Sequence, residues 1–176
     1  MLKRLARLPL LWLMLAAIVP PACTPSPAPQ TSSAAPALPP YLRQDLYPRW
    51  IDAQAQVRWP PDNGCAAAPV ASTIPPNTLI DRFGSENGTF VSPKGQPFAA
   101  RAVPYVCEQM AYTVYLVTRP LPVQSCKAAP WFGEPGGATQ YQTAEPASKL
   151  RESGAIQGVA NDASGNAQSA PQCAGS

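Results

Sequence analysis

Hydrophobic residues in this chain gather in short stretches, and the patterns of these stretches predict β-strands more often than helices. The clearest stretch is Ala111–Thr118, which is rich in β-branched and aromatic residues and contains no Gly or Pro. Such a composition is typical of a strand. Shorter pieces at Thr78–Ile80 and Thr89–Val91 predict two further strands. The Asn87-Gly88 pair between them is a strong hairpin signal. Val123 marks the expected start of another strand.

Two other segments complete the expected secondary structure. Pro97–Pro104 is predicted to be a short extended segment. Pro146–Ser153 predicts a short helix, because Pro stands at its start and Gly154 follows its last turn. Leu150 is expected to face the sheet. The fold class predicted from these patterns is α+β, a small sheet-dominated domain with a short helix near the C-terminus.

The N-terminal pattern is typical of a secretory signal. Lys3, Arg4 and Arg7 precede the apolar run Leu8–Val19, which at 12 residues is shorter than the roughly 20 that a membrane-spanning helix needs. We therefore expect a secreted or extracellular protein. Cys23 is a candidate for a lipid-modified N-terminus that would anchor the protein at the cell surface, and cleavage after Ala37 is an alternative.

Composition divides the rest of the chain. The segment that follows the signal is rich in Pro and small polar residues, which favours an extended linker. The last residues are mostly Gly, Ala, Ser, Asn and Gln. The expected parts are a secretory signal at 1–22, a linker at 23–40, a globular domain at 41–160 and a loose tail at 161–176.

Charge and composition exclude several classes of function. The chain has 13 Lys and Arg against 10 Asp and Glu, and three of the basic residues lie in the signal. The remainder is formally neutral, which argues against a nucleic-acid partner, since nucleic-acid binders need a basic surface. The sequence contains no His. This excludes Ser-His and Cys-His nucleophile pairs and zinc sites built on imidazole.

The five cysteines predict a disulfide framework. If Cys23 is lost or lipidated, four remain: Cys65, Cys107, Cys126 and Cys173. This number fits two disulfides in an oxidising compartment and leaves three possible pairings open. A zinc site with four thiolates is the alternative, but no C-x2-C spacing supports it. We therefore expect no metal site.

Two unusual stretches carry the candidate chemistry. Ala129–Tyr141 runs from aromatic residues into Pro-Gly-Gly, a composition that brings backbone close to a ligand and directs Gln140 towards it. The stretch from Thr78 to Pro93 supplies a cation and two aromatic rings. Together they predict a pocket for an anionic, aromatic small molecule. Trp131 and Phe132, within the first stretch, are expected to pack against the sheet.

Five short motifs, in this order, resemble the necrotizing-toxin (TNT-type) NAD glycohydrolases. This family includes bacterial toxin domains and secreted fungal surface enzymes, and the resemblance covers roughly residues 70–160. The motifs are Asp81-Arg82-Phe83-Gly84, Gly88-Thr89-Phe90-Val91-Ser92-Pro93, Ala100-Arg101-Ala102-Val103-Pro104, Tyr112-Thr113-Val114-Tyr115 and Ala129 to Tyr141.

The resemblance implies an enzyme that hydrolyses NAD to nicotinamide and ADP-ribose. It places catalytic roles on Gln140 and Arg82, and substrate-binding roles on Phe83, Phe90 and Arg101. NAD is then the substrate, and no cofactor is expected. The sequence departs from the family's pattern in three places: it lacks a His that some members carry, Glu134 stands where Gln is usual, and Ala138 replaces a Gly. Glu134 is expected to bring a carboxylate near the site.

The expected chemistry needs no His. Nicotinamide leaves NAD as a neutral pyridine, so no general acid has to protonate it, unlike the leaving oxygen of an ordinary glycoside. Arg82 and Arg101 would bind the pyrophosphate or ribose hydroxyls through their guanidinium forks. Phe90, with Phe83 or Trp131, would stack on the nicotinamide ring. The amide of Gln140 would orient the water or the ribose.

Two other functions remain open from the sequence. One is a catalytically weak or inactive secreted module that binds a nucleotide or a protein, which the missing His and Glu134 support. The other is an ADP-ribosyl transferase built on the same pocket. An immunity or inhibitor protein is a further expected partner, whereas no nucleic acid and no transmembrane segment are expected.

Overall fold

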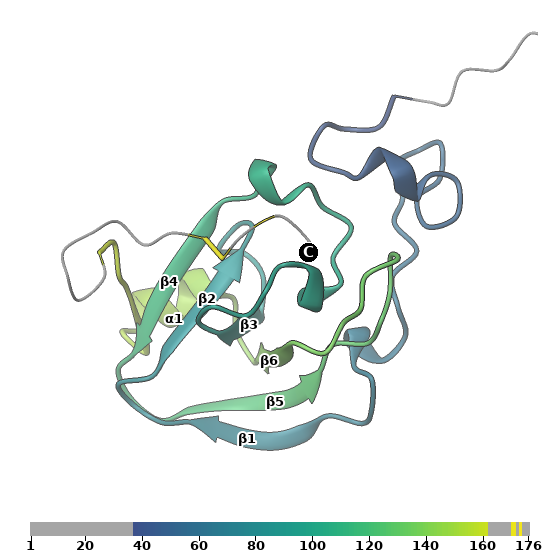
Figure 1. Cartoon of the computed structure of the whole chain (residues 1–176). Helices are drawn as coiled ribbons and strands as arrows, with labels where there is room; N and C mark the ends of the chain where they lie inside the picture. Colours follow the sequence, from purple (N-terminus) through teal and green to yellow (C-terminus); the bar gives the residue numbers. More distant parts are fainter. Residues whose placement is uncertain (1–36, 162–169, 172, 174–176) are drawn as a thin grey trace, which may run out of the picture. The chain divides into compact units, whose positions relative to one another are not determined.

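The computed structural model describes residues 37–161, 170, 171 and 173, and its centre is one antiparallel sheet (Figure 1). Seven strands lie in the order β1-β5-β6-β3-β2-β4-β7, and each neighbouring pair is antiparallel. The strands are β1 (Val70–Ile74), β2 (Leu79–Phe83), β3 (Phe90–Pro93), β4 (Tyr112–Val117), β5 (Leu121–Lys127), β6 (Thr139–Thr143) and β7 (Ile156–Gly158). The sheet-dominated α+β prediction is confirmed.

The predicted helix is present as α1 (Ala147–Glu152), the only α-helix among the described residues. Gly154, with φ of 69°, ends it in the left-handed conformation, where its amide donates to the carbonyl of Arg151. The amide of Ala155 donates to the carbonyl of Leu150, which completes a Schellman motif. Leu150 and Ala155 then lie in the core beneath the sheet, as the sequence predicts for Leu150.

Three-residue 3-10 helices link the other elements. They are η1 (Gln44–Leu46), η2 (Asp62–Gly64), η3 (Ala99–Arg101) and η4 (Cys107–Gln109). The prediction of an extended segment over Pro97–Pro104 is therefore wrong, because η3 forms its centre. The reason is tertiary: the turn carries the Arg101 side chain back to a buried carboxylate on β2, and that contact overrides local propensity.

Two apolar clusters stabilise the described part of the chain. The first packs one face of the sheet against α1 and includes Ile80, Val91, Tyr115 and Leu150. α1 lies behind β2 and β4 in Figure 1, whereas η3 lies in front of the sheet. The sheet is thus covered by α1 on one face, and the opposite face is left for a site.

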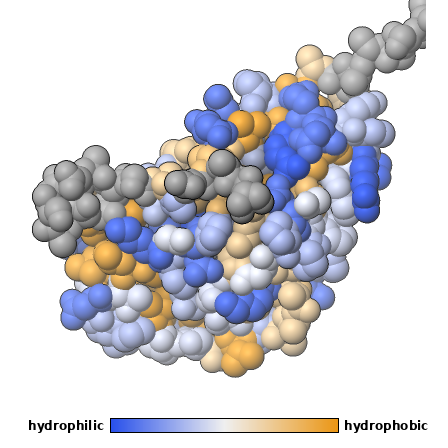
Figure 2. Space-filling view, in the orientation of Figure 1, coloured by the Kyte–Doolittle hydropathy of each residue, from blue (hydrophilic) through white to orange (hydrophobic). Residues whose placement is uncertain are grey.

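The second cluster joins the N-terminal segment, residues 37–66, to the Gly-rich loop, residues 129–138. Phe132 is fully buried against Leu42, Leu46 and Ile51, and Trp131 packs on the same group. The prediction that these two aromatic residues are structural therefore holds, but they pack on the N-terminal segment and not on the sheet. Figure 2 shows hydrophilic residues gathered over this segment, at the upper right of the view.

The predicted β2–β3 hairpin forms with a wider turn than the Asn87-Gly88 pair alone would give. The two strands pair antiparallel through only two residue pairs, Ile80 with Pro93 and Asp81 with Ser92. The chain then opens, and the amide of Gly88 donates to the carbonyl of Ser85 at 3.4 Å. The opening between β2 and β3 is where the site begins.

Two disulfides connect the four described cysteines. Cys65 pairs with Cys126, and Cys107 pairs with Cys173. This selects one of the three pairings that the sequence left open. Among the described residues no helix is long and apolar enough to cross a membrane. The predicted secretory signal, Cys23, the linker up to residue 36 and most of the predicted tail lie outside the described residues.

Candidate functional site

A cavity of about 500 Å³ opens on the face of the sheet opposite α1. Its walls come from β2, β3, β6, the loop after η3 and the N-terminal segment. All five residues that the sequence assigns to the site line it: Arg82, Phe83, Phe90, Arg101 and Gln140. The structure therefore brings together residues that lie up to 58 positions apart in the chain.

Strand alternation explains why Ser92 and Phe90 of β3 lie on the face of the sheet that borders this cavity. Ile80 and Val91 point into the core beneath α1, so their neighbours Asp81 and Ser92 point to the opposite face. Asp81 lies directly across from Ser92 in the β2–β3 pairing. Phe90 shares that face with Ser92, since the two residues are two positions apart along β3.

Arg82 bridges the opening between β2 and β3. Its Nη1 donates to the carbonyl of Phe90 at 2.6 Å, and its Nε donates to the carbonyl of Ser85 at 2.6 Å. None of the ion pairs among the described residues involves Arg82. Burial lowers its pKa, because removing the guanidinium from water disfavours its charge. Arg82 is thus a half-buried cation with neutral acceptors, a state that an anionic ligand would stabilise.

The turn after β2 is held in place by α1. The carbonyls of Glu86 and Gly88 accept hydrogen bonds from the amides of Ser148 and Ala147 at the start of the helix. The carboxylate of Glu86 also accepts a hydrogen bond from the Tyr115 hydroxyl at 3.0 Å. These contacts fix the turn whose Ser85 carbonyl orients Arg82.

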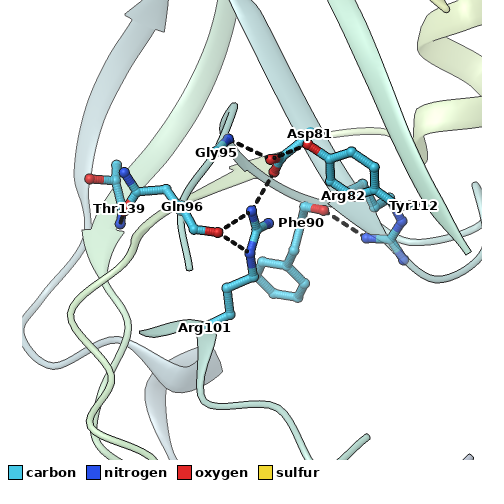
Figure 3. Close-up of polar contacts among 8 residues, drawn as sticks. All are labelled: Asp81, Arg82, Phe90, Gly95, Gln96, Arg101, Tyr112 and Thr139. Atoms are coloured by element: carbon cyan, nitrogen blue, oxygen red, sulfur yellow. Dashed lines mark hydrogen bonds and ion pairs between the residues drawn. The ribbon is translucent and has the colours of Figure 1, made fainter. Parts of the chain in front are cut away.

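Arg101 lies in a buried network (Figure 3). Its Nη2 is 2.6 Å from Oδ1 of Asp81, a residue with no exposed surface. The other Asp81 oxygen accepts hydrogen bonds from the Tyr112 hydroxyl at 3.0 Å and the Gly95 amide at 2.9 Å. Nε and Nη2 of Arg101 also approach the carbonyl of Gln96.

Two aromatic rings lie along the same wall. Phe83 contacts Phe98 edge-on with ring centroids 4.8 Å apart, and the Arg101 guanidinium lies 4.9 Å from the Phe83 ring. Phe83 is therefore held on both sides. Phe90 lines the cavity and has no such close ring contact among the described residues. Trp131, the alternative stacking residue, is not part of the lining.

Gln140 lies on β6 and reaches across to the N-terminal segment. Its Nε2 donates to the carbonyl of Asn63 at 2.9 Å. Cys126 stands directly opposite Gln140 in the β5–β6 pairing, and its disulfide ties Cys65 to this strand. Asn63 and Gln140 therefore form one corner of the cavity, which this disulfide fixes.

The charged side chains in the cavity lining are basic. That lining, as far as the described residues form it, contains two arginines and no Asp or Glu. Glu134, expected to bring a carboxylate near the site, lies outside the lining and forms an ion pair with Arg43 of the N-terminal segment. The Gly-rich loop thus turns its acidic residue towards the segment on which it packs, where Arg43 neutralises the carboxylate. No cluster of metal-ligating residues is present among the described positions.

Sequence reasoning missed the part of the wall that the N-terminal segment and Tyr105 contribute. Trp59, Asn63 and Tyr105 line the cavity but belong to none of the recognised motifs. Trp59 was detectable only as a large aromatic residue beside Pro60-Pro61, a pattern common to ordinary turns. No local signal connects these residues to the site.

Comparison with known proteins matches the region that carries the five site residues found through motifs. The family model described as "Tuberculosis necrotizing toxin" matches residues 73–159. A curated relative from Aspergillus fumigatus, the conidial surface nicotinamide adenine dinucleotide glycohydrolase nadA, is 39% identical over 98 residues. The match covers 48% of this chain and 42% of that protein, so the chain spans less than half the length of this relative.

Two solved structures are more distant. One is tuberculosis necrotizing toxin complexed with its immunity factor IFT, with a TM-score of 0.49 and 18% identity over 61% of this chain and 65% of that one. The other is Tse6 in complex with Tsi6, with a TM-score of 0.34 and 19% identity over 52% of this chain and 71% of that one.

Proposed function

Because residues 73–159 form a domain of the tuberculosis necrotizing toxin family, we propose that this chain is an NAD glycohydrolase. The relative from Aspergillus fumigatus, which is named for that activity, supports the proposal. The observation that carries it is Arg82, a half-buried guanidinium with neutral acceptors in a cavity whose described lining holds no carboxylate. NAD supplies the anionic pyrophosphate that such a cation would bind.

The reaction breaks the bond between C1′ of the ribose and the pyridinium nitrogen of nicotinamide. The electron pair of that bond goes to the nitrogen, so nicotinamide leaves uncharged and the ribose becomes oxocarbenium-like. Water then attacks C1′ and loses a proton to the solvent. The products are nicotinamide, ADP-ribose and one proton. Neither step needs a His or a carboxylic acid.

The side chains in the cavity supply what the reaction still needs. Arg82 would bind the pyrophosphate, and its bonds to the carbonyls of Ser85 and Phe90 hold its guanidinium in place beforehand. Phe90 would stack on the nicotinamide ring. Gln140, already oriented by the Asn63 carbonyl, would direct its amide oxygen towards the water or the ribose hydroxyls.

Arg101 has a different role in this proposal. Its guanidinium neutralises the buried Asp81 carboxylate and lies against the ring of Phe83. The predicted contact of Arg101 with substrate would therefore use only its remaining Nη1. Its main contribution is to hold Phe83 and η3 at the cavity wall.

The inactive binding module is the weaker alternative. One of its two supports was a carboxylate next to the ligand, and Glu134 instead pairs with Arg43 outside the cavity lining. The other support, the missing His, has no weight when the leaving group departs uncharged. The ADP-ribosyl transferase uses the same cavity and differs only in the acceptor.

The two disulfides support a location outside the reducing cytoplasm. We propose that the protein is secreted or held at the cell surface, as the Aspergillus relative is named for a conidial surface. An immunity or inhibitor protein for this chain stays a prediction, and co-purification with the secreted enzyme would test it.

The purified, oxidised chain incubated with NAD tests the proposal directly. We expect equal amounts of free nicotinamide and ADP-ribose. Loss of one buried charged contact typically costs about 2–5 kcal/mol, so Arg82→Ala should lower kcat/KM about 30-fold or more. Gln140→Ala should lower kcat. Arg119→Ala and Gln157→Ala, which change exposed residues away from the cavity, are the matched controls.

Three outcomes would contradict parts of the proposal. No turnover with retained NAD binding would favour the inactive module. Label from NAD on a protein acceptor would favour the transferase. Full activity of folded Arg82→Ala and Gln140→Ala variants would show that the reaction occurs elsewhere. Thermal unfolding of each variant separates loss of function from loss of fold.

A further inference from the structure

Trp59 is a large aromatic side chain that remains exposed at the cavity. It lines the cavity wall, and 55% of its surface is open to solvent. It precedes the segment that the family model matches, so nothing in that match assigns it a role. An exposed tryptophan loses the stabilisation that burial of its ring would give.

Neighbouring residues hold Trp59 in place. The ring contacts the buried Phe132 edge-on, with centroids 5.7 Å apart and planes at 87°. Tyr105 lies on another side at 6.2 Å. The preceding residue, Arg58, donates its amide to Trp50 and accepts a hydrogen bond from the indole of Trp131. Contacts with Phe132 and Tyr105 therefore hold the Trp59 ring in place, while the rest of its surface faces the cavity and solvent.

Trp59 lies near the proposed anion-binding residue. Tyr105 contacts Trp59, and both line the same cavity as Arg82. The Arg82 guanidinium also opposes the rise that burial causes in the pKa of Tyr105. Phe90 approaches Arg82 from another element, because its carbonyl accepts the Nη1 hydrogen bond. The cavity therefore has two separate aromatic surfaces, Phe90 on β3 and Trp59 on the N-terminal segment, each linked to Arg82.

A dinucleotide has the matching chemical order. Two flat bases stand at its ends, and an anionic pyrophosphate joins them. If Phe90 takes the nicotinamide and Arg82 the pyrophosphate, the second base needs another aromatic surface. Base stacking on an aromatic side chain is worth about a 5- to 150-fold change in affinity by alanine substitution.

We propose that Trp59 binds the adenine base of NAD by stacking, and so sets the preference for a dinucleotide over a mononucleotide. This inference rests on the proposed NAD glycohydrolase function. Trp59 is a binding residue and takes no part in bond cleavage.

Steady-state kinetics on the full chain test this inference. Trp59→Ala should raise KM for NAD by about 5- to 150-fold and change kcat by less than about twofold, because the reacting bond lies at the other end of the ligand. The inhibition constant of AMP, which carries adenine but no nicotinamide, should rise by the same factor. That of nicotinamide mononucleotide, which lacks adenine, should not change.

Two variants control for structural effects. Trp59→Phe keeps a ring and should restore most of the affinity for NAD and AMP. Tyr41→Ala removes another exposed aromatic residue that contacts Tyr105, at 6.3 Å, but does not line the cavity. It should leave both constants unchanged. Unfolding temperatures of the variants show whether packing on Phe132 survives.

The outcomes separate this inference from the proposed function. If the wild-type chain releases no nicotinamide, the proposed function fails. If it hydrolyses NAD but Trp59→Ala leaves KM and the AMP constant unchanged, the stacking role is overturned while the function stands. Equal weakening of AMP and nicotinamide mononucleotide would also overturn it, because a distorted cavity affects both ligands. Failure of AMP to inhibit the wild-type enzyme would do the same.

Discussion

Gly88 lies directly against the guanidinium of Arg82. A Cβ placed on Gly88 would come within 1.8 Å of Nη2 and 2.4 Å of Cζ of that side chain. The φ of Gly88 is not positive, so any residue could adopt its backbone conformation. Position 88 therefore requires Gly because the Arg82 guanidinium occupies the space that a side chain would need. Arg82 can keep its hydrogen bonds to the carbonyls of Ser85 and Phe90 only because position 88 has no side chain.

Gly88→Ala is expected to lower kcat/KM while leaving the fold intact. The new methyl group would displace the end of the Arg82 side chain from its two carbonyl partners. Because Arg82 can move, the main loss should be in NAD hydrolysis, by roughly 10- to 100-fold, with a small change in unfolding temperature. Nicotinamide release and thermal unfolding measure the two effects.

Gly158→Ala is the matched control for that variant. Gly158 lies on β7 and has no positive φ, and a Cβ added to it would meet no other atom within 4 Å. It should behave as wild type. A Gly88→Ala variant with full activity would show that the observed position of Arg82 is not needed for the reaction.

Asp81→Ala is expected to destabilise the protein strongly. It would leave Arg101, whose side chain is only 9% exposed, without its carboxylate partner, and it would also remove the acceptor of the Tyr112 hydroxyl. Breaking one member of a buried ion pair typically costs about 3–5 kcal/mol. Urea unfolding measures the loss. A change below about 1 kcal/mol would mean that solvent reaches and compensates Arg101.

The two disulfides form a natural matched pair. They close loops of similar length, with sequence separations of 61 and 66, so removing either should cost about 4 kcal/mol in a chain-entropy estimate. Only Cys65–Cys126 stands beside Gln140 and the Asn63 carbonyl. At a temperature where both variants are folded, a Cys65→Ser/Cys126→Ser double variant should lose more activity than a Cys107→Ser/Cys173→Ser double variant.

Equal activity of the two double variants at equal folded fraction would contradict this placement. Nicotinamide release, normalised to the folded fraction from circular dichroism, gives the comparison. Gln140→Ala in each background is a further check. It should have a smaller additional effect when Cys65 and Cys126 are already replaced, because the corner that they fix is already loosened.

Stability should fall in alkali because of Tyr115. Burial, with the hydrogen bond to Glu86 and the charge of Glu86, raises the pKa of Tyr115 from 10.0 to about 12. The folded chain therefore retains a proton that the unfolded chain loses near pH 10. The stabilisation is fully present below about pH 10 and is lost as the pH rises towards about 12.

Tyr115→Phe isolates this contribution. At neutral pH the variant should be about 1 kcal/mol less stable, since it lacks the hydrogen bond to Glu86. Its stability should also decline less steeply than that of wild type above pH 10. Unfolding by urea at a series of pH values measures both slopes, and parallel slopes would show that Tyr115 titrates normally.

The local sequence pattern was sufficient to predict those elements in which residue propensity and burial favour the same structure. β4 lies within the predicted Ala111–Thr118 strand, and α1 ends before Gly154 as expected, because propensity and burial agree there. The prediction of an extended segment over Pro97–Pro104 was wrong because a distant contact there overrides the local propensity. The Arg101–Asp81 ion pair draws that chain into a 3-10 turn, and no neighbouring residue signals a partner 20 positions away.

The candidate site shows the same division. Arg82, Phe83, Phe90, Arg101 and Gln140 were found through motifs, and all of them line one cavity. The sequence could not show that Arg101 is paired with Asp81 or that Glu134 pairs with Arg43, since both contacts depend on how distant segments pack. It offered no indication of Trp59 for the same reason.

The wall contributed by the N-terminal segment has a practical consequence for where an expressed domain should begin. A protein trimmed to residues 73–159 would keep both guanidiniums and the Gly-rich loop, yet it would lack Trp59, the Asn63 carbonyl and Cys65. Cys173 would be lost as well, so Cys126, beside Gln140, and Cys107 would both lack their partners and be free to pair with each other during oxidative folding. The family match therefore begins after several residues that line the cavity. Expression should start ahead of Leu38, the first buried residue of the described chain.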